Sequence, residues 1–217
     1  HLAGWSPDEI PAGSIEQLDN TPLKRGFDHF YGTLFGGNNY FDPKFLYKNH
    51  EPIEALEPNF YYTDAISREA VRNINAHRAG YSDQPFFLYL AYTAPHWPLQ
   101  APAETIDKYR EVYSIGWDEL RQKRLSRVKA QAIVPQDLAL ASLDEKTPLW
   151  TKVENKALFI EKMAVHAAMV EHLDRGVGQV LSALRAQGEL DNTVIMVMSD
   201  NGASAENLFE MPDWKRF

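Results

Sequence analysis

The sequence predicts an α/β fold in which a mostly parallel or mixed sheet carries helices on both faces. Two apolar runs indicate this class: residues 86–92 read FFLYLAY and residues 194–198 read VIMVM. A run that is apolar at every position suits a strand buried between two layers, because both of its faces need apolar cover. Helical patterns precede and separate these runs, and that alternation is typical of a layered α/β domain.

Helices are expected where apolar residues repeat at a spacing of three to four. The first lies over residues 64–78, and Thr63 or Asp64 can cap it. The other predicted helices cover residues 103–112, 117–131 and about 156–187. Before them, residues 1–62 are rich in turn formers and aromatic residues, which predicts loops and one short strand near residues 45–48.

The helix over residues 156–187 is the longest periodic element, and Gly188 supplies its stop signal. Gly176 and Gly178 weaken a helix interior by up to about 1 kcal/mol each, so they are expected to permit close packing. Its predicted apolar stripe consists of Phe159, Met163, Val170, Leu173, Val177, Val180, Leu181 and Leu184. No internal repeat or flexible linker divides the chain, so residues 1–217 are interpreted as part of one domain.

Composition indicates a globular protein and excludes several classes. The 217 residues include 44% hydrophobic and 24% charged residues, which is not a disordered composition. A formal net charge of −8 argues against nucleic-acid binding. No apolar run reaches about 18 residues, so no transmembrane helix is predicted. The absence of Cys excludes disulfides, thiolate metal sites and cysteine nucleophiles within these residues.

Polar residues with chemical potential follow both predicted strands. His96 lies just beyond the first, and Asp200 and Asn201 lie just beyond the second. Ligands collect at the carboxyl ends of strands in open α/β sheets, so these side chains are expected to share one crevice. Asp200 and Asn201 offer hard oxygen ligands for Ca²⁺ or Mg²⁺, although Asp-Asn-Gly is also a good turn sequence.

His96 stands between prolines, in APHWPL, which fix the backbone around it. A fixed imidazole can donate a hydrogen bond to an anion or protonate a leaving group, or it can serve only as a structural donor. Five other histidines show no paired metal-ligand spacing and are interpreted as structural or surface residues: His29, His50, His77, His166 and His172.

Several motifs closely resemble the type I arylsulfatases of the alkaline phosphatase superfamily. Residues 85–102, PFFLYLAYTAPHWPLQAP, resemble the second signature region, and residues 193–202, TVIMVMSDNG, resemble the metal-binding strand end. Shorter matches are HLAG at residues 1–4, RGFDHFYG at 25–32 and YFDP at 40–43. They occur in the family's order, which implies an incomplete, alkaline-phosphatase-like α/β fold.

The resemblance also implies residue roles. His96 would bind the sulfate group, Asp200 and Asn201 would bind one divalent cation, usually Ca²⁺, and His1 would match a histidine near the nucleophile and the ester oxygen. Asp200 would also contact the nucleophile. The family hydrolyses sulfate esters through a formylglycine hydrate made from Cys or Ser in a C/S-x-P/A-x-R motif. The hydrate attacks sulfur and the alcohol leaves; the sulfated intermediate then collapses, losing sulfate, to regenerate the aldehyde. The metal stabilises charge on the transferring oxygens.

The chain departs from the family pattern in ways that bear on activity. It has no Cys, none of its Ser residues begins the formylglycine motif, and the early Asp-Asp metal pair is absent. The Lys expected two positions before His1 is missing, and a further sulfate-binding Lys would lie past Phe217. The chain is therefore expected to be an internal fragment of a sulfatase catalytic domain, without turnover on an aryl sulfate by itself.

Two other functions stay open at this point. A phosphodiesterase or phosphonate hydrolase of the same superfamily would share the metal chemistry. A catalytically dead paralogue would bind sulfated glycans without cleaving them. The expected partner is a small-molecule or glycan sulfate ester, and the resemblance favours a periplasmic or secreted enzyme.

Overall fold

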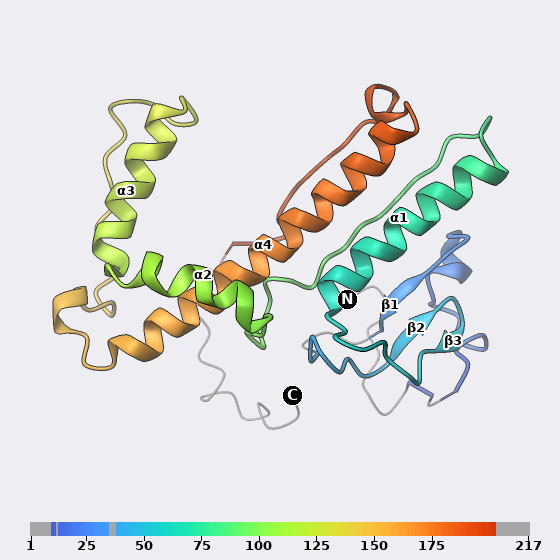
Figure 1. Cartoon of the computed structure of the whole chain (residues 1–217), viewed down its shortest axis with the longest axis horizontal. Helices are drawn as coiled ribbons and strands as arrows, with labels where there is room; N and C mark the ends of the chain where they lie inside the picture. Colours follow the sequence, from blue (N-terminus) through green and yellow to red (C-terminus); the bar gives the residue numbers. More distant parts are fainter. Residues whose placement is uncertain (1–9, 12, 35–37, 203–217) are drawn as a thin grey trace. The chain divides into compact units, whose positions relative to one another are not determined.

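The computed structural model describes residues 10–11, 13–34 and 38–202 (Figure 1). The chain divides into two compact units. Unit 1 comprises residues 1–98 and 172–217, and unit 2 comprises residues 99–171. The interpretation of residues 1–217 as one partial catalytic domain stays a prediction.

A small antiparallel sheet lies in unit 1. Its strands are β1 (Tyr31–Thr33), β2 (Leu46–Lys48) and β3 (Glu51–Pro52), in that order. Gly32 pairs with Tyr47 across the first ladder, and Lys48 pairs with Glu51 across the second. The short 3₁₀ helix η2 (Leu23–Arg25) precedes the sheet. The strand predicted near residues 45–48 is confirmed as β2.

Helix α1 (Tyr62–Gly80) confirms the helix predicted over residues 64–78. Its cap is different, because Tyr61 holds the N-cap position and no side chain caps the helix. Asp64 instead lies in the first turn, where a carboxylate is favourable beside the helix dipole, and its oxygen bonds His172. The predicted capping by Thr63 or Asp64 is therefore wrong.

Helix α4 (Lys156–Ala186) buries a different stripe from the predicted one. Val180 and Leu184 are buried as expected, but Phe159 and Val170 are 38% and 41% exposed. Residues four apart line the buried face: Ala164, Ala168, His172, Gly176, Val180 and Leu184. The small residues in this stripe, Ala164, Ala168 and Gly176, let a neighbouring helix approach closely, which a pattern of large apolar residues does not reveal.

Three glycines in or just after α4 had predicted roles, and two of these predictions are confirmed. A Cβ at Gly176 would lie 2.1 Å from Ser67 Oγ on α1, so close packing there is confirmed. A Cβ at Gly178 would meet nothing within 4 Å, so the packing role predicted for Gly178 is wrong. Gly188 has a φ of +72° and lies two residues after Ala186, where α4 ends, so the predicted stop signal is confirmed.

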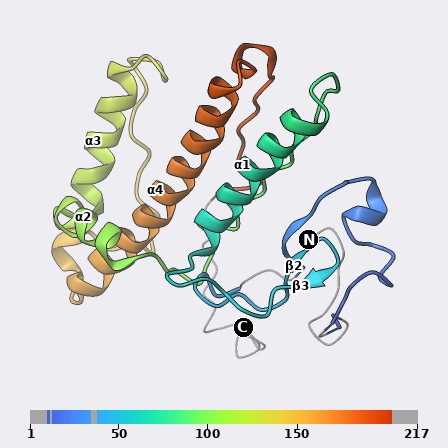
Figure 2. The ribbon, with the colours of Figure 1, turned by 45° about the vertical axis from the view of Figure 1, so that its right-hand side comes forward.

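One core of unit 1 lies between α1 and the C-terminal part of α4, which run side by side in Figures 1 and 2. Its buried members are Ala70, Ile74, Val180 and Leu184. Leu190, at the start of the 3₁₀ helix η4 (Leu190–Asn192), packs against them. A second core, of Ile10, Ile15 and Tyr47, lies against the small sheet.

Unit 2 consists of α2 (Ala103–Tyr113), α3 (Gly116–Ala130), the 3₁₀ helix η3 (Trp150–Lys152) and residues 156–171 of α4. Buried Trp150 packs edge-on against Trp117 at 4.7 Å between ring centroids. Its backbone N–H donates to Asp118 Oδ2 at 2.7 Å. The helices predicted over residues 103–112, 117–131 and 156–187 are confirmed as α2, α3 and α4.

The two apolar runs are extended but not paired as strands within the described residues. In residues 86–92, Leu88 and Leu90 pack against the core of α1 and α4, whereas Phe87 and Tyr89 are 75% and 62% exposed. Residues 194–198 are exposed on both faces. The predicted burial between two layers is therefore wrong for this chain, because no described strand pairs with either run and only one face of the first is covered.

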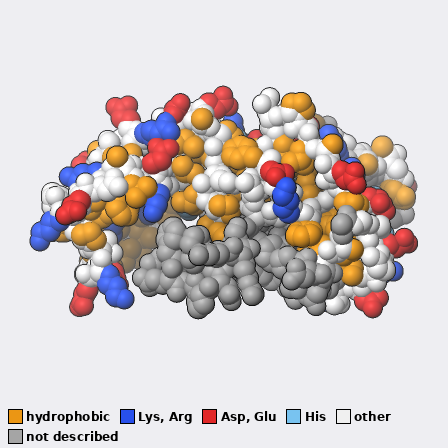
Figure 3. Space-filling model, turned by 90° about the horizontal axis from the view of Figure 1, so that it is seen from below, with side chains coloured by type: hydrophobic (Ala, Val, Ile, Leu, Met, Phe, Trp, Pro, Cys, Tyr) orange, Lys and Arg blue, Asp and Glu red, His pale blue; other side chains and the backbone are white. Residues whose placement is uncertain are grey.

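The predicted class is nevertheless confirmed at its coarse level: the chain is a partial α/β domain, with helices and a small sheet. Hydrophobic side chains show at the surface in Figure 3, among charged ones. Of the helices in the described part of the chain, none combines the length and apolarity needed to cross a membrane.

Candidate functional site

His96 lies in a tight loop at the end of the extended run over residues 86–92. Its backbone N–H donates to the Thr93 carbonyl at 2.9 Å, which closes a turn over residues 93–96. Ala94, within this turn, is buried, whereas the His96 side chain is exposed. The loop therefore keeps its backbone against the protein and presents the imidazole to solvent.

One hydrogen bond determines which nitrogen of His96 is available to a ligand. Nδ1 lies 2.7 Å from the Trp97 carbonyl oxygen. Since a carbonyl only accepts, Nδ1 must carry a proton and donate. Nε2 has no hydrogen-bond partner among the described residues. In the imidazolium form Nε2 also donates, which suits an anion such as a sulfate group.

A buried phenol lies behind the His96 loop. The Tyr40 hydroxyl donates to the His96 carbonyl oxygen at 2.9 Å, and the Tyr40 side chain is 1% exposed. Its ring stacks on Tyr61 at 5.8 Å between centroids, and its carbonyl accepts from Tyr62 N–H at 2.8 Å. Burial raises the pKa of Tyr40, so the phenol stays protonated and able to donate. The YFDP motif at residues 40–43 did not indicate this role of Tyr40.

The aromatic packing continues from Tyr61 to a polar cluster on α4. The His172 ring meets Tyr61 edge-on at 4.7 Å between centroids and is 3% exposed. Its Nδ1 lies 2.8 Å from Asp64 Oδ1, and Arg175 Nη2 lies 2.9 Å from the same ring. This arrangement fits the structural role predicted for His172.

The candidate metal ligands lie at an exposed turn. Ser199 Oγ donates to the Asn201 carbonyl at 2.6 Å, and Asn201 Nδ2 donates to the Gly202 carbonyl at 2.7 Å. These bonds leave Asn201 Oδ1 and the Asp200 carboxylate without a partner in the described part of the chain. Two hard oxygen donors fit part of a Ca²⁺ or Mg²⁺ shell. Among the described residues, no group of three or more His, Cys, Asp or Glu could hold a metal ion.

The predicted crevice that unites these side chains stays a prediction. Across residues 10–11, 13–34 and 38–202, no hydrogen bond or ion pair joins His96 to Asp200 or Asn201. His1, the other candidate catalytic residue, lies outside the described residues. Within the described residues, the His96 loop is thus held by a contact from a distant part of the chain, whereas the hydrogen bonds at the metal-ligand candidates are local.

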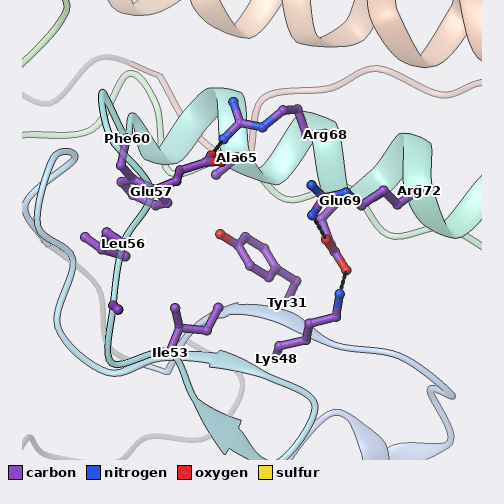
Figure 4. Close-up of a pocket in the computed structure, with 11 residues that line it drawn as sticks. Tyr31, Lys48, Ile53, Leu56, Glu57, Phe60, Ala65, Arg68, Glu69 and Arg72 are labelled. Atoms are coloured by element: carbon purple, nitrogen blue, oxygen red, sulfur yellow. Dashed lines mark hydrogen bonds and ion pairs between the residues drawn. The ribbon is translucent and has the colours of Figure 1, made fainter.

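A pocket of about 200 Å³ lies between the small sheet and α1 in unit 1 (Figure 4). At one end the Glu69 carboxylate, with its side chain 5% exposed, pairs with Lys48 Nζ at 2.5 Å and Arg72 Nη1 at 3.0 Å. Another ion pair joins Arg68 to Glu57. Tyr31 also lines the pocket. Its pKa is raised to about 12, chiefly by burial of the side chain. The cations here already have carboxylate partners, and none of His96, Asp200 and Asn201 lines the pocket.

Comparison with known proteins defines the class to which this fold and these motifs belong. The sulfatase family profile matches residues 4–213, which is nearly the whole chain. The chain belongs to the sulfatase family.

Particular relatives carry the same family name. The chain is 37% identical over 212 residues to an uncharacterized sulfatase of Schizosaccharomyces pombe, covering 89% of this chain and 38% of that protein. It is 32% identical over 213 residues to an arylsulfatase of Klebsiella aerogenes, covering 91% and 45% respectively. It is 26% identical over 194 residues to arylsulfatase J of Mus musculus, covering 85% and 24%. The chain spans less than half the length of these curated relatives.

Proposed function

We propose that the whole protein is an arylsulfatase-type sulfuric ester hydrolase that cleaves a small-molecule or glycan sulfate ester. The observation that carries this proposal is the family match over residues 4–213. Relatives named as arylsulfatases support the arylsulfatase type. The 217-residue chain by itself would lack turnover, because the residue that becomes formylglycine is expected outside it.

His96 would bind the sulfate group of the ester. The bond from Nδ1 to the Trp97 carbonyl directs Nε2 away from the loop backbone, and the ring is exposed to an incoming ligand. As an imidazolium, His96 would donate through Nε2 to a sulfate oxygen and would add a positive charge beside it. His1 would lie near the ester oxygen, where an imidazole can transfer a proton to the departing alcohol.

Asp200 and Asn201 would hold one divalent cation, Ca²⁺ or Mg²⁺, together with ligands from outside this chain. Their donor set fits, because both side chains keep an oxygen free of protein partners in the described part of the chain and both oxygens are hard ligands. A bound cation would supply positive charge that stabilises the negative charge on the sulfate oxygens. Formylglycine, made from Cys or Ser, would supply the nucleophile.

Replacing His96 by Ala in the whole protein tests the site. We expect kcat/KM for 4-nitrophenyl sulfate to fall at least about a hundredfold, because a positioned donor to a developing oxyanion is worth about that much. His77→Ala is the matched control. His77 also bonds a backbone carbonyl through one ring nitrogen, to Gln84 at 2.8 Å, but belongs to the C-terminal turn of α1. It should keep nearly full activity.

Undiminished activity of His96→Ala would contradict the assignment of His96. The substrate class is tested on the unaltered whole protein by comparing 4-nitrophenyl sulfate with bis(4-nitrophenyl) phosphate. Preference for the phosphate diester would replace the sulfatase proposal by a phosphodiesterase. Binding of a sulfated glycan without turnover of either ester would indicate a catalytically dead paralogue.

A further inference from the structure

Tyr40 contacts the His96 loop from a part of the chain more than fifty residues away. Its hydroxyl donates to the His96 carbonyl oxygen at 2.9 Å, and the Thr93 side chain also hydrogen-bonds this hydroxyl. Both ends of the turn over residues 93–96 therefore meet the same buried oxygen. A hydrogen bond to a carbonyl restrains the peptide plane that follows His96, and with it the direction of the side chain.

Tyr40 is itself held firmly, so it can act as a fixed support. The side chain is almost fully buried, and its ring stacks on Tyr61, which in turn packs edge-on against His172 of α4. The Tyr40 carbonyl accepts from Tyr62 N–H at the start of α1. Asn39, just before Tyr40, accepts through Oδ1 from the backbone N–H groups of Phe41 and Asp42, just after it, at 2.8 and 3.0 Å. The support thus connects α1 and α4 to the His96 loop.

We propose that Tyr40 is a positioning residue that orients His96 toward the sulfate group through its hydroxyl. This inference rests on the proposed role of His96, and it adds a residue that the proposed function does not name. Tyr40 acts through the loop backbone and is not in contact with the ester. The hydroxyl stays protonated because burial raises its pKa, so the donated bond persists over the working pH range of an enzyme.

Tyr40→Phe in the whole protein removes the hydroxyl and keeps the ring that stacks on Tyr61. We expect kcat/KM for 4-nitrophenyl sulfate to fall about tenfold, since a small misplacement of a substrate-binding group costs one to two orders of magnitude. Tyr47→Phe is the matched control. Tyr47 is equally buried in unit 1 and donates to the Pro11 carbonyl at 2.6 Å, far in sequence from His96. Tyr47→Phe should lower stability similarly without lowering kcat/KM.

A double-mutant cycle separates positioning from a general structural effect. If Tyr40 acts through His96, Tyr40→Phe should cause no further loss in a His96→Ala background. Multiplicative losses would show that Tyr40 acts by another route and would overturn the inference, as would full activity of Tyr40→Phe. If the unaltered protein is an active sulfatase and the His96→Ala variant keeps that activity, the proposed role of His96 would be overturned, and the inference with it.

Discussion

The two predicted strands, residues 86–92 and 194–198, lead to His96 and Asp200 respectively, and these two C-terminal ends differ in how many contacts hold them in place. At the His96 end, Leu88 and Leu90 pack on the core of α1 and α4, and the Tyr92 hydroxyl bonds Ser67 Oγ at 2.9 Å. At the Asp200 end, residues 194–198 are all at least 44% exposed. In the described part of the chain, the side-chain hydrogen bonds of Ser199 and Asn201 reach no further than the next two residues.

This difference shows that apolar sequence alone does not place a functional residue. Both runs are apolar at nearly every position, yet within the described residues the first packs against the core of α1 and α4, whereas the second is exposed. Long-range contacts to buried groups restrain a loop because those groups have little freedom of their own. Residues of this chain thus hold the His96 loop in place. The Asp200 turn offers metal ligands, but the described residues provide only part of their surroundings.

The Asp200 end gives the largest expected effect in this comparison. We expect Asp200→Ala in the whole protein to lower activity at subsaturating Ca²⁺ about a hundredfold, because loss of a charged ligand weakens metal binding at least as much as loss of the groups that orient ligands. The measurement is sulfate-ester turnover titrated with Ca²⁺ after chelation. Asp191→Ala, an exposed Asp in η4 before the same segment, serves as the control and should titrate normally. An unchanged Ca²⁺ requirement in Asp200→Ala would remove Asp200 from the metal site.

The packing that supports the His96 end can be tested by measuring stability, without an assay of enzymatic activity. Gly176→Ala would place a Cβ 2.1 Å from Ser67 Oγ and 2.6 Å from the Tyr92 hydroxyl, so both must move. We expect the free energy of unfolding to fall by about 2 kcal/mol, the usual cost of overpacking. Gly178→Ala, two residues along α4, meets nothing within 4 Å and should gain up to about 1 kcal/mol from helix propensity. Urea unfolding measures both, and equal effects at the two positions would contradict the close approach of α1 and α4.

The helices could be predicted from sequence because their signals are local. The spacing of Ile66, Ala70 and Ile74 indicated α1, and Gly188 indicated the end of α4. The buried face of α4 could not be predicted in the same way. It depends on which neighbour comes close, and residues such as Ala168 and Gly176 carry no apolar signal large enough to reveal that.

The candidate site shows the same division. His96, Asp200 and Asn201 could be selected from short motifs, because each motif is contiguous in the chain. Tyr40 could not, because its bond to His96 joins two loops across 56 residues and no local pattern records such a pair. Strand burial was also beyond local sequence, since pairing requires a second strand at hydrogen-bonding distance.

The smallest expected effect comes from replacing a serine by alanine near each of the two ends: Ser67 near the His96 end and Ser199 at the Asp200 end. Ser67 is fully buried, donates to the Thr63 carbonyl at 3.0 Å and shares a bond with the Tyr92 hydroxyl, so Ser67→Ala should cost about 1 kcal/mol of unfolding free energy. Ser199 is exposed, and its one hydrogen-bond partner among the described residues is the Asn201 carbonyl, where water can replace it. Ser199→Ala should therefore change stability by less than about 0.5 kcal/mol. Urea unfolding of the two variants against the unaltered protein measures the difference. A cost at Ser199 equal to that at Ser67 would mean that the Asp200 turn is fixed as firmly as the His96 loop.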